Sequence, residues 1–146
     1  MKIMTVFIDV SAWVAITDAA DANHSVATGY FKELLEKNTK MICNNAVIDQ
    51  ALQEIKKRLG NDKAKQFLNI IDESVLTINL RMDWLARRVR RNALTRYLKD
   101  DKDLELIHYY IFETIDRKKV DIIFSFDQRL ARFGLPIMPN TGKVHE

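Results

Sequence analysis

The chain opens on KIMTVFID (residues 2–9), a nearly unbroken apolar run that ends in an acidic residue. A strand covered by helices on both faces is continuously apolar rather than alternating, so we predict a buried strand over residues 3–8. VDIIFSFD (residues 120–127) repeats this design near the other end of the chain. Between the two runs, short apolar segments alternate with segments of helical period. This alternation predicts an α/β fold, a three-layer α/β/α sandwich with a central parallel sheet.

The remaining elements follow from periodicity and from capping residues. We predict further strands over residues 41–43, 75–80, 120–126 and 136–138. We predict helices over residues 12–17, 25–37, 45–59, 62–73, 82–98, 103–118 and 127–133. Residues 1–139 are expected to form a single domain, with residues 140–146 as a flexible C-terminal tail.

Composition narrows the class of protein. The chain has 146 residues, of which 47% are hydrophobic, which is typical of one globular domain. The only cysteine is Cys43, so neither an intrachain disulfide nor a cysteine-rich metal site can form. We find no signal peptide and no apolar run of about 18 residues, so we expect a cytoplasmic protein without a membrane span.

Two predicted strands end in similar polar sequences. Asp9 and Ser11 follow the first strand, while Ser125 and Asp127 follow the strand over residues 120–126. Ligands of open parallel sheets bind at the carboxyl ends of the strands, and hard divalent cations prefer oxygen ligands. The two aspartates are therefore candidate metal ligands. Alternatively, each one caps the short helix that follows it.

Other phosphate and hydrolase chemistries lack their motifs. The sequence contains neither a GxxxxGK[ST] loop nor a GxGxxG turn after a strand. Ser11 stands where a haloacid-dehalogenase-type phosphatase would need a second aspartate. The G-x-S-x-G turn of serine hydrolases is also missing.

Four segments together resemble the PIN-domain family, in particular toxin ribonucleases of the VapC type. They are VFIDVSAWVAITDAADANHSVA (residues 6–27), NAVIDQALQEIKKRLG (45–60), DKDLELIHYYIFETI (101–115) and IIFSFDQRLARFGLPIMP (122–139). The resemblance implies a PIN fold and a divalent-metal-dependent endoribonuclease that uses Mg²⁺ or Mn²⁺ to activate water. It also implies RNA as substrate, a homodimer, and an antitoxin-like protein partner that silences the toxin.

The sequence departs from the family pattern at two of four acidic positions. Asp9 and Asp127 match the family and would be the metal ligands, with Ser11 and Ser125 supporting them by hydrogen bonds. Gln50 falls where the family has its second acid, and His108 where it has its third. The formal ligand charge falls from about −4 to −2, which weakens the binding of a hard cation.

Neighbouring residues offer substitutes for the missing acids. Glu105 lies three residues before His108 on the same helical face, where it is either a further site residue or a surface ion-pair partner. Glu54 lies one turn after Gln50, whereas Asp49 points about 100° away on a helix. For His108 three interpretations stand: a metal ligand, an imidazolium that replaces the metal between the two aspartates, or an unrelated core histidine.

Residues 81–99, RMDWLARRVRRNALTRYLK, hold six arginines, one lysine and one aspartate. Arginine forks suit phosphate, so we predict RNA binding by one group of side chains: Arg87, Arg88, Arg90, Arg91 and Arg96. The alternative is a solvated helix with Trp84, Leu85, Val89 and Leu94 on its buried side.

Two functions stay open on the sequence. The first is a metal-dependent ribonuclease with an altered and weakened active site, of the kind that acts as the toxin of a toxin–antitoxin pair. The second is a catalytically inactive PIN-like module that binds RNA or a protein partner.

Overall fold

The computed structural model describes residues 3–77, 79–100 and 103–140. In this part of the chain, five parallel strands form one sheet in the order β3-β2-β1-β4-β5. The strands are β1 (Thr5–Ile8), β2 (Lys40–Asn44), β3 (Leu80–Asp83), β4 (Ile122–Phe124) and β5 (Ile137–Met138). The strand order reverses at β1, between its neighbours β2 and β4, and ligands of open parallel sheets bind at such a point.

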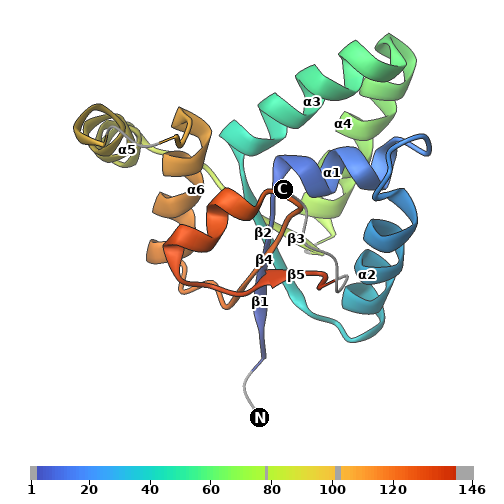
Figure 1. The fold of residues 1–146 in the computed structure, drawn as a ribbon. Coiled ribbons are helices and arrows are strands. Elements are labelled where there is room, and N and C mark those ends of the chain that lie inside the picture. The colour runs from blue at the N-terminus through green and yellow to red at the C-terminus, as the bar shows by residue number, and fades with distance from the viewer. Residues whose placement is uncertain (1–2, 78, 101–102, 141–146) are drawn as a thin grey trace.

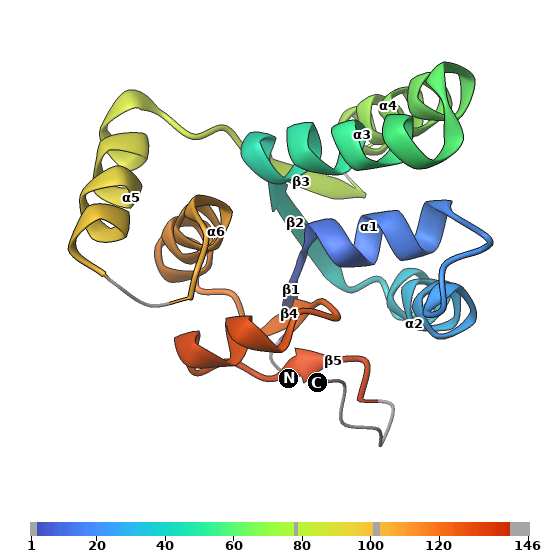
Figure 2. The same ribbon diagram turned by 45° about the horizontal axis from the view of Figure 1, so that its top comes forward.

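Helices cover both faces of the sheet. In Figures 1 and 2, α1 to α4 lie above and to the right of the strands and form one layer, while α5 and α6 form the layer to the left. The bounds are α1 (Val10–Thr17), α2 (His24–Glu36), α3 (Asn45–Leu59), α4 (Asn61–Leu76), α5 (Arg87–Lys99) and α6 (Leu106–Arg117), followed by the 3₁₀ helix η1 (Gln128–Phe133). The predicted three-layer α/β/α sandwich with a parallel sheet is confirmed.

The core lies on both sides of the central strands. Phe7, Ile42, Ile123 and Phe124 are all fully or almost fully buried, as expected for strands between two helical layers. This packing fixes where β1 and β4 end relative to the helices, and therefore the positions of the residues that follow them.

A buried polar network ties α6 to β2 and β3. The Asn44 amide donates to the Thr114 hydroxyl over 3.0 Å, and that hydroxyl donates to Asp83 over 2.7 Å. Arg117 completes the network with an ion pair to Asp83. Because buried polar groups are costly unless paired, this network holds α6 in one position against the sheet.

Several predicted boundaries are wrong. The segment 75–80 was expected to be a strand, but α4 continues to Leu76 and β3 begins at Leu80. Buried Phe67 and Ile71 and half-buried Val75 lie on one helical face, and this face keeps the helix packed on the core beyond residue 73.

The helix predicted over residues 82–98 begins five residues late, at Arg87, because Met82 and Asp83 pair with β2. Trp84, which the alternative of a solvated helix placed on the buried side, is 71% exposed, and the buried residue of α5 is Ala93. The helix predicted over residues 103–118 is shorter as well, since α6 begins at Leu106.

No helix among the described residues has the length and apolar character that a membrane crossing requires. Of the predicted tail, residues 141–146 lie outside the described residues.

Candidate functional site

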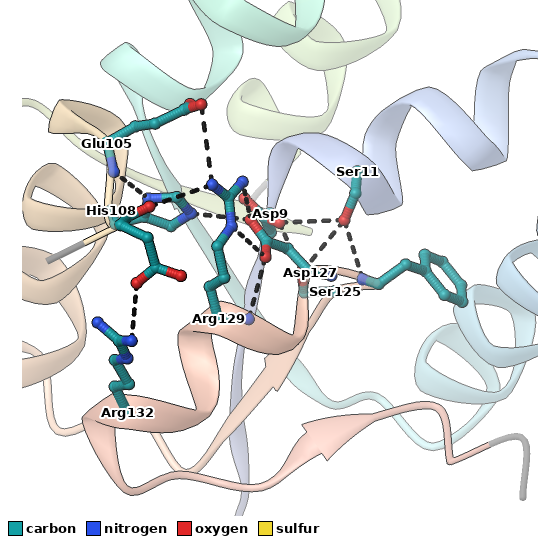
Figure 3. Close-up of polar contacts among 10 residues, drawn as sticks. Asp9, Ser11, Glu105, His108, Ser125, Asp127, Arg129 and Arg132 are labelled. Carbon is teal, nitrogen blue, oxygen red and sulfur yellow. Dashed lines mark hydrogen bonds and ion pairs between the residues drawn. The ribbon is translucent and has the colours of Figure 1, made fainter. Parts of the chain in front are cut away.

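Asp9 and Asp127 come together at one edge of the sheet. β1 and β4 are adjacent, with Ile8 paired to Phe124, so the two aspartates leave neighbouring strands in the same direction. Figure 3 shows both carboxylates beside His108 and Arg129. They share a cavity of about 260 Å³ that is lined by α1, α3, α6 and η1 and also contains Ser11, Gln50, Glu54, Arg58 and Glu105.

Asp9 is buried and held by two hydroxyl groups. Its Oδ2 accepts hydrogen bonds from Ser125 over 2.6 Å and from Ser11 over 3.0 Å. Burial raises the pKa of Asp9, and these hydroxyl donors offset only part of that rise, while the nearby charge of Asp127 adds to it. Although Asp9 precedes α1, its side chain makes no capping hydrogen bond there.

The two serines also connect the aspartates through the backbone. Ser125 Oγ accepts the backbone N–H of Asp127 over 2.9 Å, while Ser11 Oγ accepts that of Phe126 over 2.9 Å. Each serine therefore donates to Asp9 and holds the turn after β4. This contact between the two strand ends fixes where the Asp127 side chain begins.

Four donors occupy the carboxylate of Asp127. Oδ1 accepts from the backbone N–H and Nε of Arg129, and Oδ2 accepts from Nη2 of Arg129 and Nε2 of His108, all over 2.8 to 3.0 Å. Burial by itself would raise the pKa of Asp127, but the donors His108 and Arg129 outweigh it and hold the pKa well below its usual range. The backbone contact is a cap of η1, so the capping interpretation holds for Asp127, although it does not hold for Asp9.

His108 is only 2% exposed and uses both ring nitrogens. The backbone N–H of Glu105 donates to Nδ1 over 2.8 Å, and Nε2 lies 2.8 Å from Oδ2 of Asp127. An Nδ1 that accepts a hydrogen bond carries no proton, so the geometry assigns the proton to Nε2 of a neutral ring. This arrangement differs from an imidazolium between both aspartates, because His108 contacts Asp127 through Nε2 while its Nδ1 faces the backbone N–H of Glu105.

Gln50 and the acidic residues considered as substitutes for the missing acids make other contacts or face elsewhere. Gln50 is exposed at the rim of the cavity, and Glu54 forms an ion pair with Arg58 over 2.9 Å. Asp49 lines a neighbouring groove on α3 instead. Glu105 caps α6 through its backbone and lies 3.8 Å from Arg129.

A hard divalent cation does not fit this set of donors. Asp127 has donors on both oxygens, His108 has no free lone pair, and Gln50 brings no charge. The Arg129 guanidinium places a positive charge 3.0 Å from each oxygen of Asp127. Consistently, no group of three or more His, Cys, Asp or Glu side chains in the described ranges is arranged to hold a metal ion.

Sequence reasoning missed Arg129. The available signal was the sequence Asp-Gln-Arg over residues 127–129, since an arginine two residues after a capping aspartate can reach back to the same carboxylate. Arg129 is therefore the residue that distinguishes this cavity from an acidic cation site.

The predicted basic residues lie on α5, beyond α6 from the sheet (Figure 2). Arg96 pairs with Glu113 over 3.4 Å and lies 4.7 Å above the Phe112 ring, so it anchors α5 to α6. The other four arginines are exposed and have no side-chain hydrogen bond or ion pair within the described residues; they are Arg87, Arg88, Arg90 and Arg91.

Comparison with known proteins identifies the fold. The sequence matches no protein-family model and no curated protein. The structure is similar to the VapC20 toxin of Mycobacterium tuberculosis, which cleaves the sarcin–ricin loop: the TM-score is 0.76 at 20% identity, over 89% of this chain and 95% of the toxin chain. It is also similar to PAE2754 from Pyrobaculum aerophilum, with a TM-score of 0.55 at 14% identity, over 92% of this chain and 89% of that chain.

These likenesses establish a PIN-like fold of the VapC type, in agreement with the resemblance seen in the sequence. At these identities the likeness concerns the fold, and the chemistry has to be argued from the residues of this chain.

Proposed function

We propose that this protein is a PIN-like RNA-binding module that does not cleave RNA by metal-dependent hydrolysis. The fold is that of a ribonuclease toxin, which favours RNA as the partner. The observation that carries the proposal is the state of Asp127, whose oxygens are occupied by Arg129 and His108.

The surface that would bind RNA is α5. Its four exposed arginines lie within two turns of one helix and have no acidic partner in the described parts of the chain. Because like charges at helical spacing destabilise a helix, an anionic partner would offset the repulsion among these arginines. Guanidinium groups match phosphate oxygens in two-point contacts, so the RNA backbone is the partner of fitting chemistry.

Binding is tested with a fluorescent single-stranded RNA and a quadruple variant, Arg87→Gln, Arg88→Gln, Arg90→Gln and Arg91→Gln. We expect weaker binding and a log K versus log[salt] slope that is smaller by about 0.7 for each phosphate that the variant no longer neutralises. The matched control removes four exposed lysines from α3 and α4: Lys56→Gln, Lys57→Gln, Lys63→Gln and Lys65→Gln. Equally weakened binding in both variants would contradict a role specific to α5.

A second function, an endoribonuclease with a weakened site, is favoured by one observation. Asp9 and Asp127 line one cavity at the strand ends of a fold that VapC20 shares. RNA incubated with the protein and Mg²⁺ or Mn²⁺ distinguishes the two functions. Cleavage that disappears in Asp9→Asn would establish the enzyme, whereas binding without cleavage supports the module.

The toxin role, the antitoxin-like partner and the homodimer belong to this second function. They stay predictions from the resemblance, as does a cytoplasmic location. Sedimentation of the purified chain tests the homodimer directly.

A further inference from the structure

A second polar cavity lies at the opposite end of the sheet. It has a volume of about 430 Å³, within the range of small-molecule sites, and surrounds the first residues of β1, β2 and β3. Its lining contains Thr5, Leu34, Leu35, Asn38, Thr39, Lys40, Met41, Ile42, Asn79, Arg81 and Lys118. Among the described residues, the lining therefore includes three cations and no carboxylate.

These cations come from β2, from β3 and from the residue after α6, and all three line the cavity. Ile42 lies two residues after Lys40, so their side chains share one face of β2, and Ile42 pairs with Arg81 of β3. Lys40 and Arg81 therefore lie on the same face of neighbouring strands. Lys118 follows the end of α6. Within the described residues, none of the three side chains has a hydrogen bond or an ion pair.

Helix capping does not account for these cations. The carbonyl of Leu34 near the end of α2 accepts the backbone N–H of Thr39 over 3.0 Å, and that of Ile115 in α6 accepts the N–H of Val120 over 3.1 Å. These carbonyls in the last turns of both helices thus have backbone donors rather than lysine or arginine side chains. Lys40, Arg81 and Lys118 are left available for an external anion.

The rest of the lining suits the body of a nucleoside. Leu34, Met41 and Ile42 contribute apolar atoms to the lining, while Asn38 and Asn79 bring amide groups that can donate and accept. A lining that combines apolar atoms, a few polar groups and cations is the usual design of a small-molecule site for an anionic ligand.

We propose that this cavity binds the phosphomonoester end of a nucleotide. The cations pair with a terminal phosphate, which carries up to two negative charges, and Arg81 supplies the two-point contact. The ligand is either a free nucleoside monophosphate or the 5′-phosphate of an RNA strand, since both present this group. The site goes beyond the proposed function, because it shares no residue with α5 or with the Asp9 cavity.

Calorimetry with AMP and anisotropy with one short RNA, made with a 5′-phosphate or a 5′-hydroxyl, test the site. The variant combines Lys40→Gln, Arg81→Gln and Lys118→Gln. Lys37→Gln is the matched control, because Lys37 lies at the same end of the molecule but already pairs with Glu33 over 2.7 Å. We expect binding to weaken about tenfold or more in the triple variant and to be unchanged in the control.

The two sources of the phosphate give different results. AMP binding that the triple variant abolishes identifies a free nucleotide, whereas a preference for 5′-phosphate over 5′-hydroxyl RNA that it abolishes identifies an RNA end. Absence of both, or effects equal to those of Lys37→Gln, overturns the site. The α5 variant separates this result from the proposed function, because it weakens binding of both RNAs and leaves AMP binding unchanged.

Discussion

Arg129 holds Asp127 in a two-point contact: Nε donates to Oδ1 and Nη2 to Oδ2, both over 3.0 Å (Figure 3). The two residues are separated by Gln128 alone, so the contact forms within one turn after β4. In an acidic cation site the same carboxylate would face a metal. Here a fixed cation of the chain itself occupies that position.

This contact predicts that Asp127 stabilises the fold. Asp127→Asn removes a charged acceptor from Arg129 and His108, and we expect a destabilisation of about 1–3 kcal/mol at pH 7 in chemical denaturation. Because folding lowers the pKa of Asp127, its contribution is present above pH 4–5 and declines as the pH falls toward the folded pKa. The difference between the two proteins should therefore shrink in acid. Asp72→Asn, an exposed position, is the control and should change little.

Asp9 is predicted to have the opposite effect. Folding raises the pKa of Asp9, so the folded chain binds its proton more tightly than the unfolded chain does, and ionised Asp9 costs stability as the pH rises. Asp9→Asn should stabilise the protein by roughly 1–2 kcal/mol at pH 7, with a smaller gain near pH 3. A lower thermal midpoint for Asp9→Asn at pH 7 would show that the charge of Asp9 is compensated in the fold.

His108 is predicted to be the neutral Nε2–H tautomer at pH 7. The reason is the donor at Nδ1, the backbone N–H of Glu105. Long-range ¹H–¹⁵N correlation spectra distinguish the two tautomers and the imidazolium directly. Two equivalent protonated nitrogens would instead indicate an imidazolium, and with it the charge replacement considered from the sequence.

Restoring the acids should not suffice to restore metal binding. With Gln50→Glu and His108→Asp, Arg129 still contacts Asp127, so we expect weak Mn²⁺ binding by calorimetry. Adding Arg129→Gln removes the competing cation, and we expect at least about tenfold tighter binding than in the double variant. Equal Mn²⁺ affinity in the double and triple variants would mean that Arg129 does not compete for Asp127.

The sequence predicted the layers and the meeting of the strand ends because both depend on local patterns. The apolar runs at residues 3–8 and 120–126 are typical of buried strands, and parallel strands end on the same edge. The boundary near residue 80 failed because Val75 is apolar in either element, and packing against the core extends α4 over it.

The pairing of side chains in the site could not be predicted from the sequence. Arg129 has several possible acceptors, and its choice of Asp127 depends on the turn that η1 makes after β4. The tautomer of His108 depends likewise on the backbone of Glu105, which a pattern of residue types does not reveal. The cavity of Lys40, Arg81 and Lys118 joins positions far apart in the chain through strand register.

The attachment of α5 has a consequence for how the protein can change over evolution. Ala93 joins Leu104 and Tyr109 in a small apolar cluster that is separate from the main core. Substitutions on the outer side of α5 therefore leave the sheet and its cavities untouched. The proposed affinity of α5 for RNA can therefore change with the gain or loss of single arginines, while the packing of the main core is unaffected.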